Sequence, residues 1–268
     1  MSGVITAEIR CDTPPNEHHA VFSLYSAGIQ FFITASPQEF SRTIARFVKD
    51  RGDILPTTHV IHGSHTFFDS IHTLLTEQIA SSGRSIYCTT GCSACCKQVI
   101  LSNPFEAALI GFNLARDKEK LERFLERYAG WDAETKAMRS RFPGWAARRA
   151  LHGVDDGSFD QMEFTAHCPF LADDLCQIYP WRPYGCRSYL ALSESCIRPR
   201  EPGQRPGRQG MGIGMSTSFH QRRQQLLGLL WQAFGVDPAK TRGHFLPDLV
   251  KHFLDGDIAG LLARCRLP

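Results

Sequence analysis

Hydrophobic and polar positions in the first third of the chain predict a small α+β region. Residues 20–36, AVFSLYSAGIQFFITAS, form an apolar and aromatic run that predicts a β-hairpin with its turn at Ser26 to Gly28. Residues 36–50 open like a helix, because Ser36 is a good N-cap and Pro37 suits the first helical position. Phe40, Ile44 and Phe47 then recur at helical spacing and give that helix one apolar face.

Helical periodicity continues downstream. A second amphipathic helix is predicted over Phe67 to Ile79, with Phe68, Ile71, Leu74, Leu75 and Ile79 on its inner side. Residues 103–117 and 117–142 predict two more helices. The first of them begins with Asn103 as N-cap, Pro104 at the first position and Glu106 three residues after the cap.

The last part of the chain predicts a loop followed by two helices. Residues 198–214, RPREPGQRPGRQGMGIG, are rich in Pro, Gly and Arg, which argues against regular structure. Helices are predicted at about Phe219 to Phe234 and Leu246 to Cys265. The predicted fold is mainly α with a small α+β N-terminal part and a loop-rich cysteine-cluster metal-binding core. Its expected divisions are residues 1–84, 85–200 for the cysteine cluster, and 201–268 for the basic loop and the helices that pack on the core.

Composition predicts a soluble cytoplasmic protein. A chain of 268 residues with 43% hydrophobic residues can bury an ordinary core without cross-links. The N-terminus lacks the basic and apolar regions of a signal peptide, and no stretch is long and apolar enough to cross a membrane. The net charge of +3 predicts no nucleic-acid partner, and local arginine clusters are interpreted as solvated surface. A protein or small-molecule partner and the oligomeric state are left open.

Eight of the ten cysteines fall into two groups, separated by 71 residues without cysteine. The first group, Cys88, Cys92, Cys95 and Cys96, has the spacing C-x3-C-x2-C-C. A C-x2-C turn brings two thiolates within reach of one ion. Cys95 and Cys96 are neighbours whose side chains diverge, so they are not equivalent ligands of a single ion. Either they serve two centres, or one binds metal and the other packs, supports or reacts.

The second group comprises Cys168, Cys176, Cys186 and Cys196, at spacings that fit a loop-rich wrap around a centre. Four thiolates on a divalent ion carry a net negative charge. Arg182 and Arg187 lie close to Cys186 in the sequence. We expect them to offset this charge from behind the ligands and to donate hydrogen bonds to sulfur.

At these residues the chain resembles the YkgJ-like cysteine-cluster proteins, known as zinc- or iron-chelating domains. The resemblance covers about 110 residues from Cys88 to Cys196. Besides the eight cysteines, it rests on Gly91, Glu106, Ala107, Phe170, Leu171, Ile178, Tyr179, Arg182, Pro183 and Arg187. One departure is the spacing of three residues between Cys88 and Cys92, where the family pattern has two. The resemblance implies metal binding.

The expected cofactor is an iron-sulfur cluster or zinc, because soft thiolates select both. An adjacent pair among eight cysteines exceeds what one structural zinc needs, which favours the cluster. His167 and His220 are candidates to replace a thiolate.

Several other interpretations compete with this one. Cys88, Cys92 and Cys95 coincide with the radical SAM signature, but the downstream sequence lacks the alternating strands and helices of that barrel. Plain burial, expected for Cys11 and Cys265, does not explain two groups of four, and disulfides do not suit the cytoplasm. Because the resemblance includes flagellin lysine N-methylases, the alternative function is a cluster-dependent enzyme acting on a protein or peptide. Whether the protein is an enzyme stays open: the glycine-rich residues 210–214 and the carboxylates Glu106, Glu163, Asp173 and Asp174 are weak indications.

Overall fold

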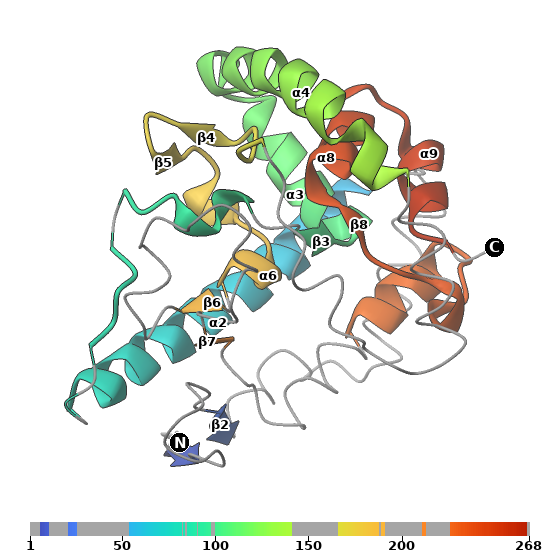
Figure 1. The fold of residues 1–268 in the computed structure, drawn as a ribbon. Coiled ribbons are helices and arrows are strands. Elements are labelled where there is room, and N and C mark those ends of the chain that lie inside the picture. The colour runs from blue at the N-terminus through green and yellow to red at the C-terminus, as the bar shows by residue number, and fades with distance from the viewer. Residues whose placement is uncertain are drawn as a thin grey trace.

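The structure is a computed structural model, and the fold it describes is mainly α-helical (Figure 1). The described residues are 6–10, 21–25, 54–81, 83, 85–89, 91–97, 100–140, 166–187, 189–190, 211–212 and 226–266. The principal helices are α2 (Leu55–Ser81), α3 (Pro104–Leu114), α4 (Lys118–Arg139), α8 (Leu246–Leu254) and α9 (Ile258–Arg264). Residues 226–233 are also helical. The predicted fold class is confirmed.

The described strands are short and pair in antiparallel twos. The pairs are β1 (Thr6–Arg10) with β2 (Val21–Tyr25), β3 (Leu101–Ser102) with β8 (His244–Phe245), β4 (Leu171–Ala172) with β5 (Leu175–Cys176), and β6 (Tyr189–Leu190) with β7 (Met211–Gly212). Short helical turns η2 (Ala94–Lys97), η3 (Tyr179–Trp181), α6 (Tyr184–Arg187) and η5 (Pro238–Lys240) complete the described elements. Within the described residues, the segments 91–97 and 166–187 contain only these short elements.

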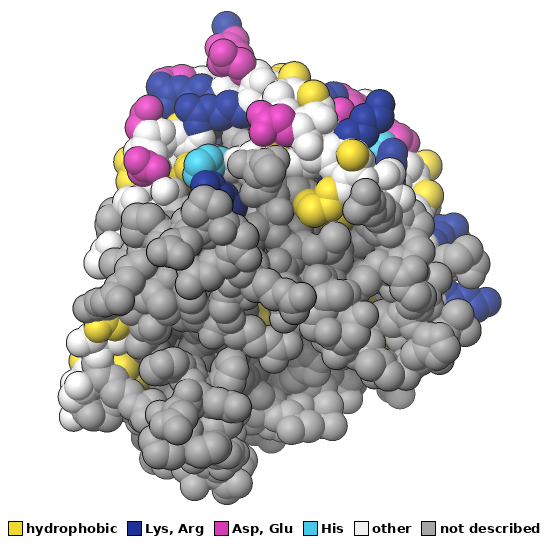
Figure 2. Space-filling view, in the orientation of Figure 1, with side chains coloured by type: hydrophobic (Ala, Val, Ile, Leu, Met, Phe, Trp, Pro, Cys, Tyr) yellow, Lys and Arg dark blue, Asp and Glu magenta, His cyan; other side chains and the backbone are white. Residues whose placement is uncertain are grey.

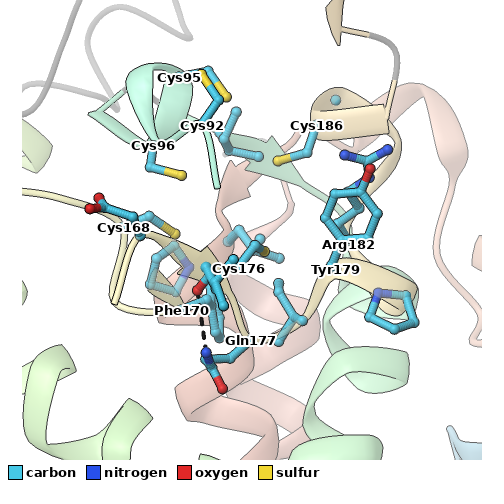
Figure 3. A pocket seen from close by; sticks show the side chains of 18 of the residues that line it. Cys92, Cys95, Cys96, Cys168, Phe170, Cys176, Gln177, Tyr179, Arg182 and Cys186 are labelled. Atoms are coloured by element: carbon cyan, nitrogen blue, oxygen red, sulfur yellow. Dashed lines mark hydrogen bonds between the residues drawn. The ribbon is translucent and has the colours of Figure 1, made fainter. Parts of the chain in front are cut away.

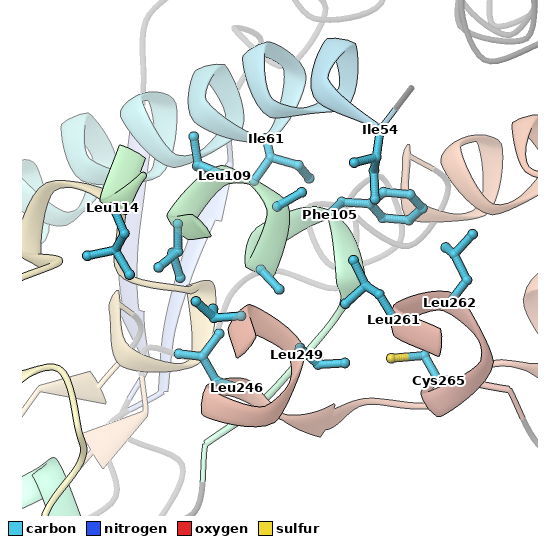
Figure 4. Packing of buried hydrophobic residues seen from close by; sticks show 14 of the residues in the cluster. Ile54, Ile61, Phe105, Leu109, Leu114, Leu246, Leu249, Leu261, Leu262 and Cys265 are labelled. Atoms are coloured by element: carbon cyan, nitrogen blue, oxygen red, sulfur yellow. The ribbon is translucent and has the colours of Figure 1, made fainter. Parts of the chain in front are cut away.

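Helix α3 is the centre of the core and lies between α2 and α8 (Figure 1). It is buried along most of its length, so its sequence is apolar nearly all round. Phe105, Leu109 and Leu114 of α3 pack in one cluster with residues of α2, α8 and α9 (Figure 4). A Cβ atom at Gly111 would lie 2.3 Å from the Phe253 ring, so glycine permits α8 to approach closely. The core therefore packs residues that precede the cysteine groups in the sequence, such as Ile61, against residues that follow them, such as Leu249.

Two predicted helices are confirmed, and the first has its predicted cap. Asn103 accepts hydrogen bonds from the amides of Phe105 and Glu106 at the start of α3, at 3.1 and 3.0 Å. Asp117 caps α4 through the Lys120 amide. Over the region of α4, charged side chains of both signs are interspersed at the surface, as expected for a solvated helix face (Figure 2).

Other elements differ from the prediction. Helix α2 begins at Leu55, twelve residues before the predicted start, because Ile54, Ile61 and His65 are buried against the core. The predicted helix at 246–265 is split into α8 and α9, since Gly256 is left-handed (φ 74°) and Asp257 accepts a bond from the Gly260 amide.

The short strands add two findings to these expectations. Residues 21–25 form a strand as predicted, and within the described residues it pairs with the upstream strand β1, with Ile9 opposite Phe22. The predicted turn at 26–28 and the helix at 36–50 lie outside the described residues. Met211 and Gly212, within the predicted irregular loop, pair with Leu190 and Tyr189. Among the described helices, none has the length and apolarity needed to cross a membrane.

Buried His244 predicts pH-dependent stability. Its Nδ1 accepts a hydrogen bond from the Phe245 amide at 2.8 Å, which requires that nitrogen to be unprotonated. Burial, helped by the charges of Arg264 and Arg242, lowers the pKa of His244 from 6.5 to about 3. Because the folded pKa lies below the unfolded value, this contribution is present above about pH 6.5 and is lost as the pH falls.

We expect the free energy of unfolding of the metal-free protein to be about 2 kcal/mol lower at about pH 5 than at about pH 7.5 through His244 alone. Urea denaturation at the two pH values measures the difference, and His244→Gln removes the titrating ring. Equal pH dependence in the variant and the unsubstituted protein would show that His244 is not responsible.

Candidate metal centre

Six cysteine thiols from both sequence groups line one cavity of about 500 Å³ (Figure 3). They are Cys92, Cys95, Cys96, Cys168, Cys176 and Cys186. None of the six is in a disulfide. Lys120 and Trp131 of α4 and Leu246 at the start of α8 also line the cavity, so the core elements form part of its wall.

A tight turn followed by η2 positions the first group. Gly91 is left-handed (φ 84°), a conformation that glycine adopts without steric cost. The Cys92 amide then donates to the Thr89 carbonyl at 3.1 Å, and the Cys96 amide donates to the Ser93 carbonyl at 2.9 Å. These bonds bring Cys92, Cys95 and Cys96 to the same cavity despite the adjacency of the last two.

Two hydrogen bonds link the cysteine groups directly. The Cys168 amide donates to the Cys96 carbonyl at 2.7 Å. The Ser93 hydroxyl donates to Asp174 at 2.8 Å, at the tip of the β4–β5 hairpin. One backbone and one side-chain hydrogen bond thus join two segments that lie more than 70 positions apart in the sequence.

The second group is carried by a hairpin and a short helix. Asp173 and Asp174 are both left-handed (φ 51° and 57°), which gives the two-residue turn between β4 and β5. This turn places Cys176 opposite Leu171 in the hairpin. Cys186 lies in α6, where its amide donates to the Pro183 carbonyl at 3.0 Å.

Burial and mutual proximity keep most of the thiols protonated. Burial raises the pKa of Cys168 to about 12 and also raises the pKa of Cys176 and Cys186. Negative charge on neighbouring cysteines raises the pKa of each of these three thiols further, because the sulfurs share one cavity. Without a cation, the cavity does not accommodate several thiolates at once.

The pKa of Cys95 shifts in the opposite direction. A hydrogen bond from the Cys96 thiol lowers the pKa of Cys95 to about 7, although burial opposes the shift. The same bond, followed by burial, raises the pKa of Cys96 far above its usual range. The adjacent pair therefore divides into a thiolate and its hydrogen-bond donor. This division was not predicted from the sequence.

Arg182 lines the same cavity as these thiols. Its guanidinium stacks on the Tyr179 ring at 4.0 Å (Figure 3). Its charge favours the thiolate and so lowers the pKa of Cys95, Cys176 and Cys186, against larger effects of burial on the last two. Arg182 Nε is buried without a hydrogen-bond partner among the described residues, which fits a site built for an anionic thiolate centre.

Arg187 is buried behind the loop that precedes Cys186. Its side chain is 2% exposed, and its described hydrogen bonds go to the carbonyls of Arg182 and Pro180 and to Asp69 of α2. Its charge still favours the Cys176 thiolate, as a smaller effect than that of Arg182. Arg187 thus mainly orders the loop that precedes Cys186.

Glu106 has contacts beyond the helix cap, and these contacts were not predicted from the sequence. A role as a helix cap was predicted, and Asn103 Nδ2 does donate to it at 3.0 Å. The carboxylate is 3% exposed and also accepts hydrogen bonds from His65 at 3.1 Å, Ser102 at 2.6 Å and the Tyr184 amide at 2.9 Å. It therefore joins α2, β3 and α6.

The remaining candidates are placed as follows. Cys88 is exposed and is not among the described residues that line the cavity. His167 is exposed, and Cys265 is buried in the hydrophobic core as predicted. Cys11, Cys196, Glu163 and His220 lie outside the described residues.

The donor chemistry of the cavity fits zinc or iron. Within the described part of the chain, no three His, Cys, Asp or Glu side chains are grouped closely enough to hold an ion as they lie. The fit rests instead on six soft sulfur donors around one cavity and on the unpartnered Arg182 Nε beside them. Coordination requires the thiols to turn toward a common centre and to lose protons.

Comparison with known families identifies this segment. Residues 87–202 match the family model described as "CxxCxxCC: Putative zinc- or iron-chelating domain". The match spans both cysteine groups, confirms the resemblance found in the sequence and supports zinc or iron binding. No curated protein and no solved structure matches the chain significantly. Nothing in these comparisons supports the lysine N-methylase alternative.

The pKa values predict that Cys95 reacts before Cys168, Cys176 and Cys186 in the metal-free protein. We expect iodoacetamide to modify Cys95 with a midpoint at about pH 7, because the thiolate is the nucleophile, while Cys168, Cys176 and Cys186 react far more slowly. Mass spectrometry of peptides after brief alkylation measures the order.

Cys96→Ala removes the hydrogen-bond donor and is expected to raise the Cys95 midpoint by about one pH unit. Cys96→Ser keeps a hydroxyl donor and serves as the matched control. An unchanged midpoint in Cys96→Ala would contradict the assignment of Cys96 as donor.

Proposed function

We propose that this protein binds an iron-sulfur cluster or zinc in the cavity where its two cysteine groups meet. One observation carries the proposal: six thiols contributed by segments on either side of a long helical insert line the same cavity. Folding therefore brings together donors that the sequence separates. The family match of residues 87–202 supports zinc or iron binding independently of the geometry.

The proposed ligands are the six cysteines of the cavity, with Cys88 and Cys196 as further candidates from the sequence pattern. Cys95 and Cys96 contribute from η2, Cys168 and Cys176 from the β4–β5 region, and Cys186 from α6. Arg182 offsets the negative charge of the thiolates. Arg187 acts less directly, by ordering the loop between Cys176 and Cys186.

An iron-sulfur cluster is preferred to a single zinc ion. Six thiols exceed the four ligands of a tetrahedral ion, and the cavity of about 500 Å³ is larger than one such ion requires. A cluster distributes its cysteine ligands over several metal atoms, so Cys95 and Cys96 need not converge on one. When bound, a cluster supplies electron transfer or redox sensing, whereas zinc supplies structural stability.

The chain itself supplies a low-dielectric pocket and positive charge. Apolar side chains, among them Phe170, Ile178 and Leu246, line the cavity beside the sulfurs. Such walls limit water access and strengthen the electrostatic effect of Arg182 on the thiolates. We propose a cytoplasmic metal-binding protein, since reduced thiols persist in that compartment.

Anaerobic purification followed by metal and sulfide analysis tests the identity of the centre. We expect iron with acid-labile sulfide and a broad absorption near about 400 nm. A colourless protein with stoichiometric zinc would exclude the cluster in favour of zinc. Protein purified without either metal, and unable to take up either one under reducing conditions, would overturn the proposed function.

Substitution of single cysteines tests the ligand set. Cys176→Ala removes a cavity thiol and is expected to lower the bound metal to less than about one tenth of the wild-type content after dialysis against chelator. Cys265→Ala is the matched control, because Cys265 is buried in the core apart from the cavity. Equal metal content in the two variants would remove Cys176 from the ligand set.

A further inference from the structure

Helix α2 presents one face to the short helix that carries Cys186. His65, Phe68 and Asp69 occupy this face, at the three- and four-residue spacings that align side chains along a helix. The Phe68 ring packs edge-on against Tyr184 of α6, with ring centroids 5.1 Å apart. Both ends of α6 therefore meet residues that precede the matched segment 87–202.

The C-terminal end of α6 is held through Asp69. Asp69 accepts a hydrogen bond from Arg187, whose charge is buried. Arg187 in turn donates to the Arg182 carbonyl at 2.7 Å and to the Pro180 carbonyl. The Asp69 carboxylate thus balances the cation that orders the loop between Cys176 and Cys186.

The N-terminal end of α6 is held through His65. His65 Nε2 lies 3.1 Å from Glu106 Oε1, and the same oxygen accepts the Tyr184 amide at 2.9 Å. With its proton on Nε2, His65 donates a hydrogen bond to the Glu106 carboxylate and fixes the orientation of that carboxylate. Cys186 lies between these two anchored positions, Tyr184 and Arg187.

We propose that α2, although it lies outside the matched family segment, is part of the metal centre, with Asp69 and His65 as positioning residues that determine how tightly Cys186 and the neighbouring thiols hold the metal. This inference rests on the proposed function. Residues that orient ligands from behind typically change metal affinity by about 10- to 100-fold when they are replaced. An isolated domain cut at the borders of the family match would lack both anchors.

The test compares Asp69→Asn and His65→Gln with Glu77→Gln in the full-length holoprotein. Glu77 is an exposed acidic residue on the same helix, so its amide variant makes a matched change of charge away from α6. The rate of metal loss is followed with the chromogenic chelator 4-(2-pyridylazo)resorcinol, which reports both zinc and iron. X-ray absorption at the edge of the bound metal gives the number and spread of metal-sulfur distances, which a merely structural role would not alter.

We expect Asp69→Asn and His65→Gln to release metal about 10- to 100-fold faster than the wild type, with a wider spread of metal-sulfur distances. Glu77→Gln should behave as the wild type. Asp69→Glu keeps the carboxylate and should restore retention to within about threefold of the wild type. If circular dichroism shows that Asp69→Asn does not fold, Arg187→Lys tests the same anchor. Lysine lacks the planar guanidinium with which Arg187 donates to Asp69 and to two backbone carbonyls.

Wild-type release rates and unchanged metal-sulfur distances in both anchor variants would overturn the inference while leaving the proposed function intact. Faster release with unchanged distances would also overturn it, since that result indicates a loss of general stability. A wild-type protein that holds no metal would instead overturn the proposed function itself.

Discussion

The described structure depends on one buried carboxylate, that of Glu106. An ionised carboxylate inside a protein is unfavourable unless hydrogen-bond donors replace its water. Donors from α2, β3, the cap of α3 and α6 surround Glu106, so each of these segments has to be in place for the charge to be compensated. The interaction connects the helical core to the cysteine-bearing α6. Glu106 therefore couples the packing of the core to the position of α6.

The thiols impose a second constraint of the same physical kind. Buried cysteines close to one another resist ionisation, and Cys168, Cys176 and Cys186 show this through raised pKa values. A metal reverses the balance by binding the thiolate form, and its binding energy then adds to the stability of the fold. Arg182 contributes in the same direction with a fixed charge. In the proposed site, protein charge and metal charge would favour the same thiolates.

Local sequence signals predicted elements well where local chemistry decides the structure. Asn103 and Pro104 predicted the start of α3, because caps satisfy amides only a few residues away. Prediction failed where packing decides. Residues 55–66 contain β-branched residues and glycine with weak helical preference, yet they extend α2 because Ile54, Ile61 and His65 are buried. The break between α8 and α9 depends on Gly256, whose left-handed conformation an apolar periodicity does not reveal.

The sequence by itself determined the chemical type of the site: grouped cysteines in an otherwise ordinary composition predict a thiolate metal centre, and the family resemblance of residues 87–202 follows from the same positions. Tertiary structure decided which residues act together. It joined the two cysteine groups through Cys96 and Cys168, separated the roles of Arg182 and Arg187, and brought His65 and Asp69 behind Cys186. The physical reason is that ligand type is a property of single side chains, whereas proximity, burial and shared hydrogen bonds arise only when distant segments pack.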